Sequence, residues 1–263
     1  IHTYEQFLKT YELARSVGFN NINIDIISGL PYQTARKYGE TLQKVIRLKP
    51  EHVSAYSLII EKDTPFYETY KFDAVRQEAG LPTEVLPSED EVYKMNKITQ
   101  IVLKKAGYNQ YEISNYAKRG FECRHNIGYW RRENYLGLGL GASSLVENVR
   151  YSNTRELYKY IEGCDNITDV GDDIFVANIH EEANVINRQA QMEEFMFLGL
   201  RMNEGVYRNE FEKCFGLPIE AVYRDQLEEL KQEDLLEMRE GRIYLTDKGM
   251  DLSNYAMAKF LMP

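Results

Sequence analysis

The run from Cys123 to Trp130 is the densest group of chemically versatile side chains in this sequence. Reading Cys-Arg-His-Asn-Ile-Gly-Tyr-Trp, it holds one of the four histidines, one of the three cysteines and the one tryptophan. An imidazole beside aromatic rings and a thiol suits a flat apolar ligand with a metal centre, because imidazole is a good axial ligand. A structural hydrogen-bonding role for His125 is the alternative. Zinc is disfavoured, because a zinc site needs three or four ligands and no second Cys/His pair is present.

A second candidate site lies in the run Asn21–Ile27, where polar and β-branched residues alternate strictly. This period of two predicts a strand with Asn21, Asn23 and Asp25 on one face and isoleucines on the other. Asp25 stands toward the C-terminal end of the strand, which is where α/β sheets and barrels bind ligands. A carboxylate there suits the hydroxyl or ammonium groups of a small molecule. The alternative is an edge strand that turns its polar face to water.

A third candidate is the glycine-rich run from Leu136 to Ser144, in which leucines and glycines alternate before Ala142 and Ser143. The pattern predicts a short strand over Leu136–Leu140 with all its glycines on one face. Glycine is costly inside a strand, so this face favours either a flat ligand or the close packing of another backbone. The spacing differs from that of the dinucleotide-binding fingerprint.

The stretch from Tyr108 to Tyr116 mixes aromatic side chains with one carboxylate, that of Glu112. We expect a strand from Tyr108 to Ile113. Glu112 could orient a neighbouring basic or amide group, but a satisfied core acid is the favoured interpretation.

The elements that must position these groups alternate between helices and strands. The predicted elements are a helix from Phe7 to Val17, a helix from Thr34 to Leu48, a strand from Val53 to Ile60, a helix from Ser88 to Ala106 and a helix from Thr154 to Ile161. Glu91 is expected to complete a capping box with Ser88. The polar stretch Glu61–Pro87 is predicted to be a long loop with no more than a short helix. This order of elements is typical of the α/β class with parallel strands.

From Met192 onward the pattern changes to closely spaced helices and a small hairpin. Helices are expected to Met202, over Asn209–Phe215 and over Ile219–Glu233, followed by strands at Leu235–Met238 and Arg242–Leu245. Helices followed by a hairpin resemble a winged helix, so we place a domain boundary near residue 190, giving domains 1–190 and 191–263. A regulator of nucleic acids is disfavoured, because Pro218–Glu240 carries eight acidic residues against three basic ones.

The composition sets further limits on function. The 263 residues carry a net charge of −9, which disfavours a polyanionic partner bound through bulk electrostatics. The three cysteines (Cys123, Cys164 and Cys214) are odd in number and widely spaced, as is typical of reduced thiols in a cytoplasm. The sequence shows neither a membrane span nor a signal peptide. It also contains no Ser/His/Asp arrangement, P-loop or metalloprotease helix that would indicate a hydrolase or a phosphotransferase.

Several strings together resemble one known family. They are Asn23–Thr34, His52–Leu58, Gly107–Ala117 and Cys123–Ser144, and they are similar to the oxygen-independent coproporphyrinogen III oxidase family of radical S-adenosylmethionine proteins. The His-Asn-x-x-Tyr-Trp string at His125–Trp130 resembles the family's haem-chaperone (HemW-type) branch. The resemblance implies an α/β fold made of the latter part of a (β/α) radical-SAM barrel and a small winged-helix-like α+β C-terminal domain. The exposed sheet edge of a partial barrel favours a homodimer.

The resemblance also implies cofactors and site residues. Asp25, Ile59 and Ser143 match S-adenosylmethionine contacts of the family, and His125 matches a haem contact and possible iron ligand. The family's Cys-x-x-x-Cys-x-x-Cys motif, which holds a [4Fe–4S] cluster, does not occur in this sequence, so the chain alone is expected to be inactive in radical chemistry.

The implied function is that of a cytoplasmic haem chaperone that passes haem or a porphyrin to a client protein. The alternative is oxidative decarboxylation of coproporphyrinogen III to protoporphyrinogen IX. A winged-helix regulator is a third, disfavoured possibility.

Overall fold

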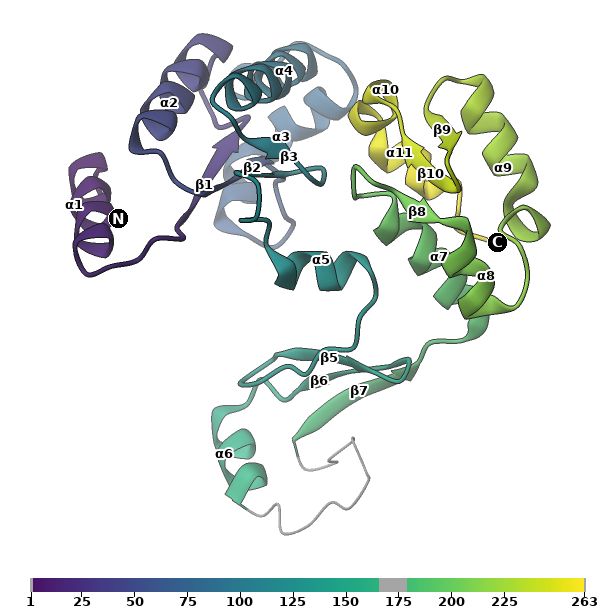
Figure 1. Cartoon of the computed structure of the whole chain (residues 1–263). Helices are drawn as coiled ribbons and strands as arrows, with labels where there is room; N and C mark the ends of the chain where they lie inside the picture. The colour runs from purple at the N-terminus through teal and green to yellow at the C-terminus, as the bar shows by residue number, and fades with distance from the viewer. Residues whose placement is uncertain (1, 166–178, 263) are drawn as a thin grey trace. The chain divides into compact units, whose positions relative to one another are not determined.

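The computed structural model describes residues 2–165 and 179–262, and the chain divides into two compact units (Figure 1). The first unit is Ile1–Glu122 and the second is Cys123–Pro263. The boundary expected near residue 190 falls within the second unit and stays a prediction about its internal organisation.

The first unit is built on a four-stranded mixed sheet. Its strands are β1 (Asn23–Ser28), β2 (His52–Ser57), β3 (Asn109–Gln110) and β4 (Asn115–Ala117), in the order β1-β2-β4-β3. The predicted parallel pairing is confirmed for β1 and β2, whereas β4 runs antiparallel to both β2 and β3. The single strand expected from Tyr108 to Ile113 is wrong in its extent, because the chain turns after Gln110 and returns as β4.

One face of this sheet is covered by α2 (Ala35–Leu48) and α4 (Glu89–Lys105), which lie on the same side of it (Figure 1). Both helices begin as predicted, because the Thr34 hydroxyl accepts the Lys37 N–H and the Ser88 hydroxyl accepts the Glu91 N–H, each at 3.3 Å. The core between helices and sheet is apolar, and its fully buried members include Tyr38, Leu42, Val53, Met95 and Leu103.

The carboxylate of Glu91 does not complete the capping box expected at Ser88. Its Oε1 instead accepts the backbone N–H of Ala35, at 2.8 Å, in the first turn of α2. A carboxylate at a helix N-terminus satisfies a backbone donor that the helix itself leaves unpaired. Glu91 therefore ties the starts of the two covering helices together, a long-range contact that the local sequence pattern does not reveal.

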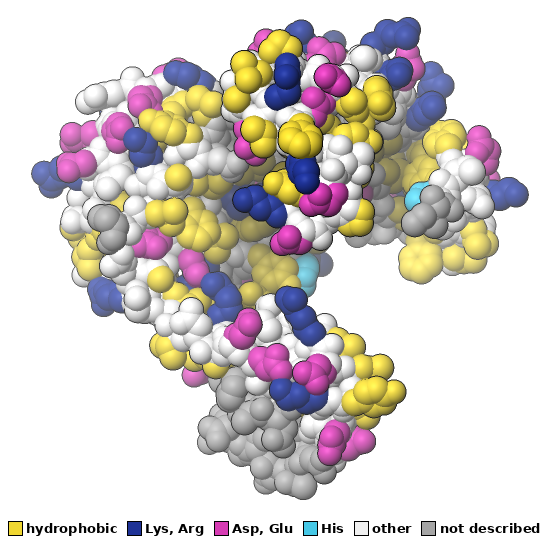
Figure 2. Space-filling model, turned by 180° about the vertical axis from the view of Figure 1, so that it is seen from behind, with side chains coloured by type: hydrophobic (Ala, Val, Ile, Leu, Met, Phe, Trp, Pro, Cys, Tyr) yellow, Lys and Arg dark blue, Asp and Glu magenta, His cyan; other side chains and the backbone are white. Residues whose placement is uncertain are grey.

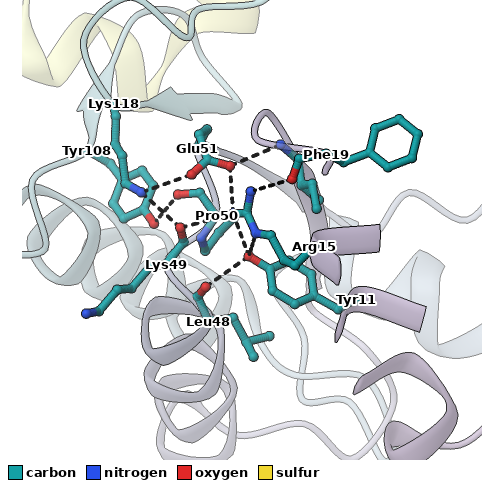
Figure 3. A network of polar contacts seen from close by, with 10 residues as sticks. Tyr11, Arg15, Phe19, Leu48, Lys49, Pro50, Glu51, Tyr108 and Lys118 are labelled. Carbon is teal, nitrogen blue, oxygen red and sulfur yellow. Dashed lines mark hydrogen bonds and ion pairs between the residues drawn. The ribbon is translucent and has the colours of Figure 1, made fainter. Parts of the chain in front are cut away.

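Where the strands begin, a polar network joins helix α1 (Tyr4–Ser16) to the sheet (Figure 3). The Glu51 carboxylate receives Arg15 at 2.7 Å, the Ile22 N–H at 3.1 Å and Lys118 at 3.4 Å. Tyr11 adds a hydrogen bond from its hydroxyl to the Leu48 carbonyl. Burial disfavours the charge of Glu51, but these donors and cations outweigh it and hold the pKa of Glu51 below its ordinary value.

The segment between β2 and α4 contains a 14-residue helix, α3 (Pro65–Glu78). The sequence predicted a loop there with at most a short helix. Thr64 caps it and Pro65 stands in its first turn. The buried Asp73 carboxylate accepts the N–H groups of Glu84, Val85 and Leu86 at 2.8, 2.7 and 2.7 Å. These three bonds hold the returning loop against the helix.

The second unit begins with α5 (Arg124–Trp130) and a three-stranded antiparallel sheet. The strands are β5 (Ser143–Val146), β6 (Val149–Asn153) and β7 (His180–Val185), in the order β5-β6-β7, and α6 (Leu157–Asp165) follows β6. The helix expected from Thr154 therefore starts three residues later. The strand predicted over Leu136–Leu140 is wrong, because that segment is irregular and ends in a turn before β5.

The C-terminal part of this unit surrounds a second three-stranded sheet. Its elements are α7 (Arg188–Gly199), β8 (Val206–Tyr207), α8 (Arg208–Phe215), α9 (Glu220–Gln232), β9 (Leu236–Arg239), β10 (Arg242–Leu245), α10 (Asp247–Asp251) and α11 (Ser253–Ala258). The predicted hairpin is confirmed as β9 paired with β10, and β8, which the sequence did not predict, pairs with β10 on its other side. Phe211, Tyr223 and Phe260 form the buried aromatic centre.

On the face shown in Figure 2, acidic and basic side chains are interspersed among hydrophobic ones. Within the two described ranges, no helix has the length and apolar character needed to cross a membrane.

Candidate functional site

The first candidate site is the face of the four-stranded sheet opposite the covering helices. Along β1, Ile24 and Ile26 are buried on the helix side, while Asn23 and Asp25 are exposed on the other side. The strand parity predicted from the sequence is therefore confirmed. In the described part of the chain β1 is the terminal strand of its sheet, as the edge-strand alternative expects, and a ligand at its polar face stays a prediction.

The pairing of β1 with β2 extends the polar face across the sheet. Asn23 lies opposite His52 and Asp25 lies opposite Ser54, and on the other side of β2 Ser54 lies opposite Asn115. Residues opposite each other point to the same face of a sheet, so these side chains form one polar surface. We call Asn23, Asp25, His52, Ser54 and Asn115 the polar face.

Four side chains on and beside the polar face are linked by short hydrogen bonds. The Asn23 amide nitrogen donates to Asp25 Oδ1 at 2.6 Å, and Asn23 Oδ1 lies 2.6 Å from Nδ1 of His52. On the far side of the ring, His52 Nε2 lies 2.8 Å from the hydroxyl of Tyr111. We call this series, from Asp25 to Tyr111, the polar chain.

His52 is the buried member of the polar chain, with 4% of its surface exposed. Burial lowers the pKa of His52 below its ordinary value, although the negative charges of Asp25 and Glu122 act in the opposite direction. The imidazole is therefore neutral at pH 7, with one nitrogen that donates and one that accepts.

Glu112 is fully buried beside the polar face and accepts the Ser114 N–H at 2.9 Å and the Asn115 side-chain amide at 2.5 Å. The two interpretations offered for Glu112 therefore coincide, because this buried acid is hydrogen-bonded and also orients an amide of the polar face.

Ile59 follows the end of β2 and exposes 75% of its surface. Asp25 and Ile59 thus belong to the first unit. The position expected for Asp25 toward the C-terminal end of its strand is wrong, because Asp25 is the third of the six residues of β1, whereas Ile59 follows the end of β2. Ser143 and His125 belong to the second unit. The expectation that Asp25, Ile59 and Ser143 all contact S-adenosylmethionine stays a prediction.

Ser143 is the first residue of β5, and its exposed hydroxyl lies 3.1 Å from that of Ser152 on β6. The glycines before it adopt a turn rather than a strand, with φ of 97° at Gly139 and 64° at Gly141. At Gly137 an added Cβ would overlap the backbone of Ala142 and Ser143. Close backbone packing, the alternative to a flat ligand, therefore accounts for Gly137.

His125 lies on α5 with its ring exposed to solvent. Its ring centroid is 4.6 Å from that of Tyr129, edge to face, and Tyr129 makes a similar contact with Tyr135, also at 4.6 Å. No hydrogen bond to the imidazole occurs within the described ranges. The structural hydrogen-bonding role is therefore not seen there, and a haem contact at His125 stays a prediction.

Trp130, at the end of the same helix, has a different environment. The Arg201 guanidinium lies 4.2 Å from the centre of its ring, a cation–π contact. Trp130 also lines a pocket of about 450 Å³, together with carboxylates that include Glu133, Glu204 and Glu210. His125 is not among the residues that line this pocket, so the histidine and the tryptophan of the motif lie in different environments.

Metal-binding chemistry is limited in the described residues. They contain no group of three or more His, Cys, Asp or Glu side chains that could hold a metal ion, and Cys123, Cys164 and Cys214 form no disulfide there. These thiols do not fit an iron–sulfur cluster, which is held by several closely placed cysteines.

Sequence reasoning missed His52, Ser54 and Tyr111 as members of this site. The signal for two of them was present, because polar residues recur at every second position of His52–Ser57, as they do in the preceding strand. Only the observed register shows that both polar sets share a face. Tyr111 comes from the turn between β3 and β4 and had no such signal.

Two comparisons, one with a family model and one with a solved structure, identify proteins that are similar to this chain. The family model described as the HemN C-terminal domain matches residues 186–252. The structure of coproporphyrinogen III oxidase (HemN) from Escherichia coli, a radical SAM enzyme, superposes with a TM-score of 0.74 at 20% identity, covering 100% of this chain and 59% of that one. The chain therefore has the mixed α/β fold of that structure.

Two curated relatives narrow the assignment. The haem chaperone HemW of Lactococcus lactis is 39% identical and that of Bacillus subtilis 33% identical, each over 99% of this chain. The chain is therefore similar to the HemW haem chaperones over nearly its whole length, and its residues 186–252 match the HemN C-terminal domain. It spans 64% of the length of either relative, which is less than two thirds.

Proposed function

We propose that this chain is part of a haem chaperone that binds haem and S-adenosylmethionine and passes haem to a client protein in the cytoplasm. The observation that carries the proposal is the 39% identity, over nearly the whole chain, to a relative named as a haem chaperone. The exposed His125 on α5, backed by the rings of Tyr129 and Tyr135, supports a haem contact at this position.

S-adenosylmethionine is proposed to contact Asp25, Ile59 and Ser143. The polar face supports this assignment for Asp25, because its carboxylate is exposed at a sheet face lined with hydrogen-bonding groups. The exposed side chain of Ile59 offers an apolar contact and the Ser143 hydroxyl a polar one. A [4Fe–4S] cluster, which would supply the electron for radical chemistry, is assigned to a part of the intact protein other than these described residues.

The architecture proposed for the intact protein is a radical-SAM (β/α) barrel whose later strands are in residues 1–190. The parallel β1–β2 pair with helices on one side supports this assignment. A winged-helix-like domain over residues 191–263 is supported by the family match that begins at residue 186 and by the β8-β10-β9 sheet. We also propose that β1 pairs with a second copy of the chain, because the terminal strand of the described sheet presents unpaired backbone groups.

The second candidate function is oxidative decarboxylation of coproporphyrinogen III, favoured by the fold shared with the E. coli oxidase. Two assays on the intact, cluster-loaded protein separate the candidates. A chaperone takes up haem in an absorption titration and forms no protoporphyrinogen from coproporphyrinogen III. Formation of protoporphyrinogen without haem uptake would overturn the proposal in favour of the oxidase.

A further inference from the structure

The hydrogen bonds of the polar chain can run in only one direction. Carboxylate oxygens accept hydrogen bonds, so the group of Asn23 that faces Oδ1 of Asp25 is the amide nitrogen, as observed at 2.6 Å. This contact fixes the orientation of the Asn23 amide. Its oxygen must then face His52 and Ser54, where it accepts the Ser54 hydroxyl at 3.2 Å.

The orientation of Asn23 determines which nitrogen of His52 carries the proton. Because Asn23 Oδ1 is an acceptor, the ring nitrogen 2.6 Å away must donate, so Nδ1 carries hydrogen. The buried ring is neutral, so Nε2 carries none and accepts from the Tyr111 hydroxyl at 2.8 Å. Donation therefore runs from Tyr111 through His52 and Asn23 to Asp25.

We propose that Tyr111, His52 and Asn23 are positioning residues that hold the Asp25 carboxylate in one orientation toward S-adenosylmethionine. The inference rests on the proposed function, and it assigns roles to three residues that do not themselves touch the ligand. Asp25 is exposed and would otherwise sample several rotamers, so ordering it before binding removes an entropy cost from the complex. One oxygen of the carboxylate, Oδ1, accepts the Asn23 amide. We assign the other oxygen to the ligand.

Two substitutions of His52 distinguish positioning from simple filling of space. The amide nitrogen of Asn stands the same number of bonds from Cα as Nδ1 of His, so His52→Asn retains a donor to Asn23. His52→Gln is closer to His in length, but its amide lies at the level of Nε2 and faces Tyr111 instead. Positioning predicts that ligand affinity survives in the Asn variant, whereas space filling predicts that it survives in the Gln variant.

The experiment is a calorimetric titration of the intact, cluster-loaded protein with S-adenosylmethionine. We expect His52→Asn to stay within about twofold of the wild-type Kd and His52→Gln to weaken binding about tenfold. Tyr111→Phe should weaken binding by only about threefold. It removes the hydrogen bond to Nε2 of His52 but leaves the hydrogen on Nδ1, which donates to Asn23. Tyr38→Phe is the matched control, since it removes a 2.9 Å hydrogen bond to Thr99 on the helix side of the same sheet, and its Kd should not change.

The outcomes separate this inference from the proposed function. If the wild type binds and the Asn and Gln variants bind equally, or Gln binds better, positioning through His52 is overturned while the proposed function stands. If the wild type binds no S-adenosylmethionine, both fail. Nitrogen-15 NMR of His52 gives an independent result, since a hydrogen on Nε2 rather than Nδ1 would overturn the direction of the chain.

Discussion

Nδ1 of His52 lies 2.6 Å from Oδ1 of Asn23 across the parallel pair β1–β2. This contact joins the polar residues of two strands into one hydrogen-bonded series that ends at Asp25. A buried imidazole, rather than a salt bridge, thus supports the carboxylate proposed to meet the ligand. Because His52 is neutral, the series does not depend on a second charge near Asp25.

His125→Ala should weaken haem binding by the intact protein about tenfold or more, because it removes the exposed imidazole proposed as an iron contact. An absorption titration with haem measures the effect. His2→Ala removes another exposed histidine and serves as the control, with no expected change. An unaltered titration curve for His125→Ala would remove this residue from the haem site.

Glu51→Gln should lower the free energy of unfolding by about 1–2 kcal/mol at pH 7, because it weakens the network that Arg15 and Lys118 make with the carboxylate. Glu40→Gln, which alters an exposed pair with Arg36, should change it by less than about 0.5 kcal/mol. Urea unfolding measures both values. Equal losses in the two variants would show that the Glu51 network adds nothing beyond an exposed ion pair.

The network around Glu51 also predicts that the stability of the fold depends on pH. The pKa of Glu51 is lower in the folded protein than its ordinary value of 4.5. Its charge therefore contributes stability that is complete above that value and is lost as the pH falls through the folded pKa. We expect the stability difference between wild type and Glu51→Gln to shrink below pH 4.5. A difference that grows in acid would contradict the assignment.

Asp73→Ala should release the loop before α4 by removing the acceptor of three backbone N–H groups, at a cost of about 2–3 kcal/mol. Hydrogen exchange at Glu84, Val85 and Leu86 should accelerate in the variant. Glu68→Gln, on the exposed side of α3, should leave these amides protected. Retained protection in Asp73→Ala would mean that other contacts hold the loop.

Two glycines should respond oppositely to alanine. Gly137→Ala should destabilise the second unit by about 2 kcal/mol or more, because the new methyl group meets the backbone of Ala142 and Ser143. Gly39→Ala lies within α2 and meets only ordinary contact with Ile98, so it should stabilise the chain by about 0.5–1 kcal/mol. Thermal unfolding of the two variants tests this contrast.

Local pattern was sufficient for much of the fold. The alternation in β1, the caps at Thr34 and Ser88 and the hairpin β9–β10 are each encoded within a few neighbouring residues. The wrong predictions concern elements whose structure depends on segments that are distant in the sequence. Helix α3 depends on the Asp73 contacts with the returning loop, and the segment from Leu136 to Leu140 is kept out of a sheet by its turn and its approach to β5.

The candidate site likewise combines a residue that a local pattern predicts with residues that only strand pairing brings in. Parity placed Asp25 on the correct face because that property belongs to one strand. His52 and Tyr111 join it only through the register of β2 and the turn between β3 and β4. Their roles are set by pairing between segments, which a single sequence does not specify.

The central claim, that the polar face of the sheet holds S-adenosylmethionine through Asp25, is tested most directly by titrating the intact, cluster-loaded wild type and Asp25→Ala with that ligand. Asp25 is exposed, so its removal should leave the melting temperature unchanged. The account predicts that the Kd rises about tenfold in the variant, as expected for the loss of a charged hydrogen-bond acceptor. An equal Kd in both proteins would contradict it and remove Asp25 from the ligand site.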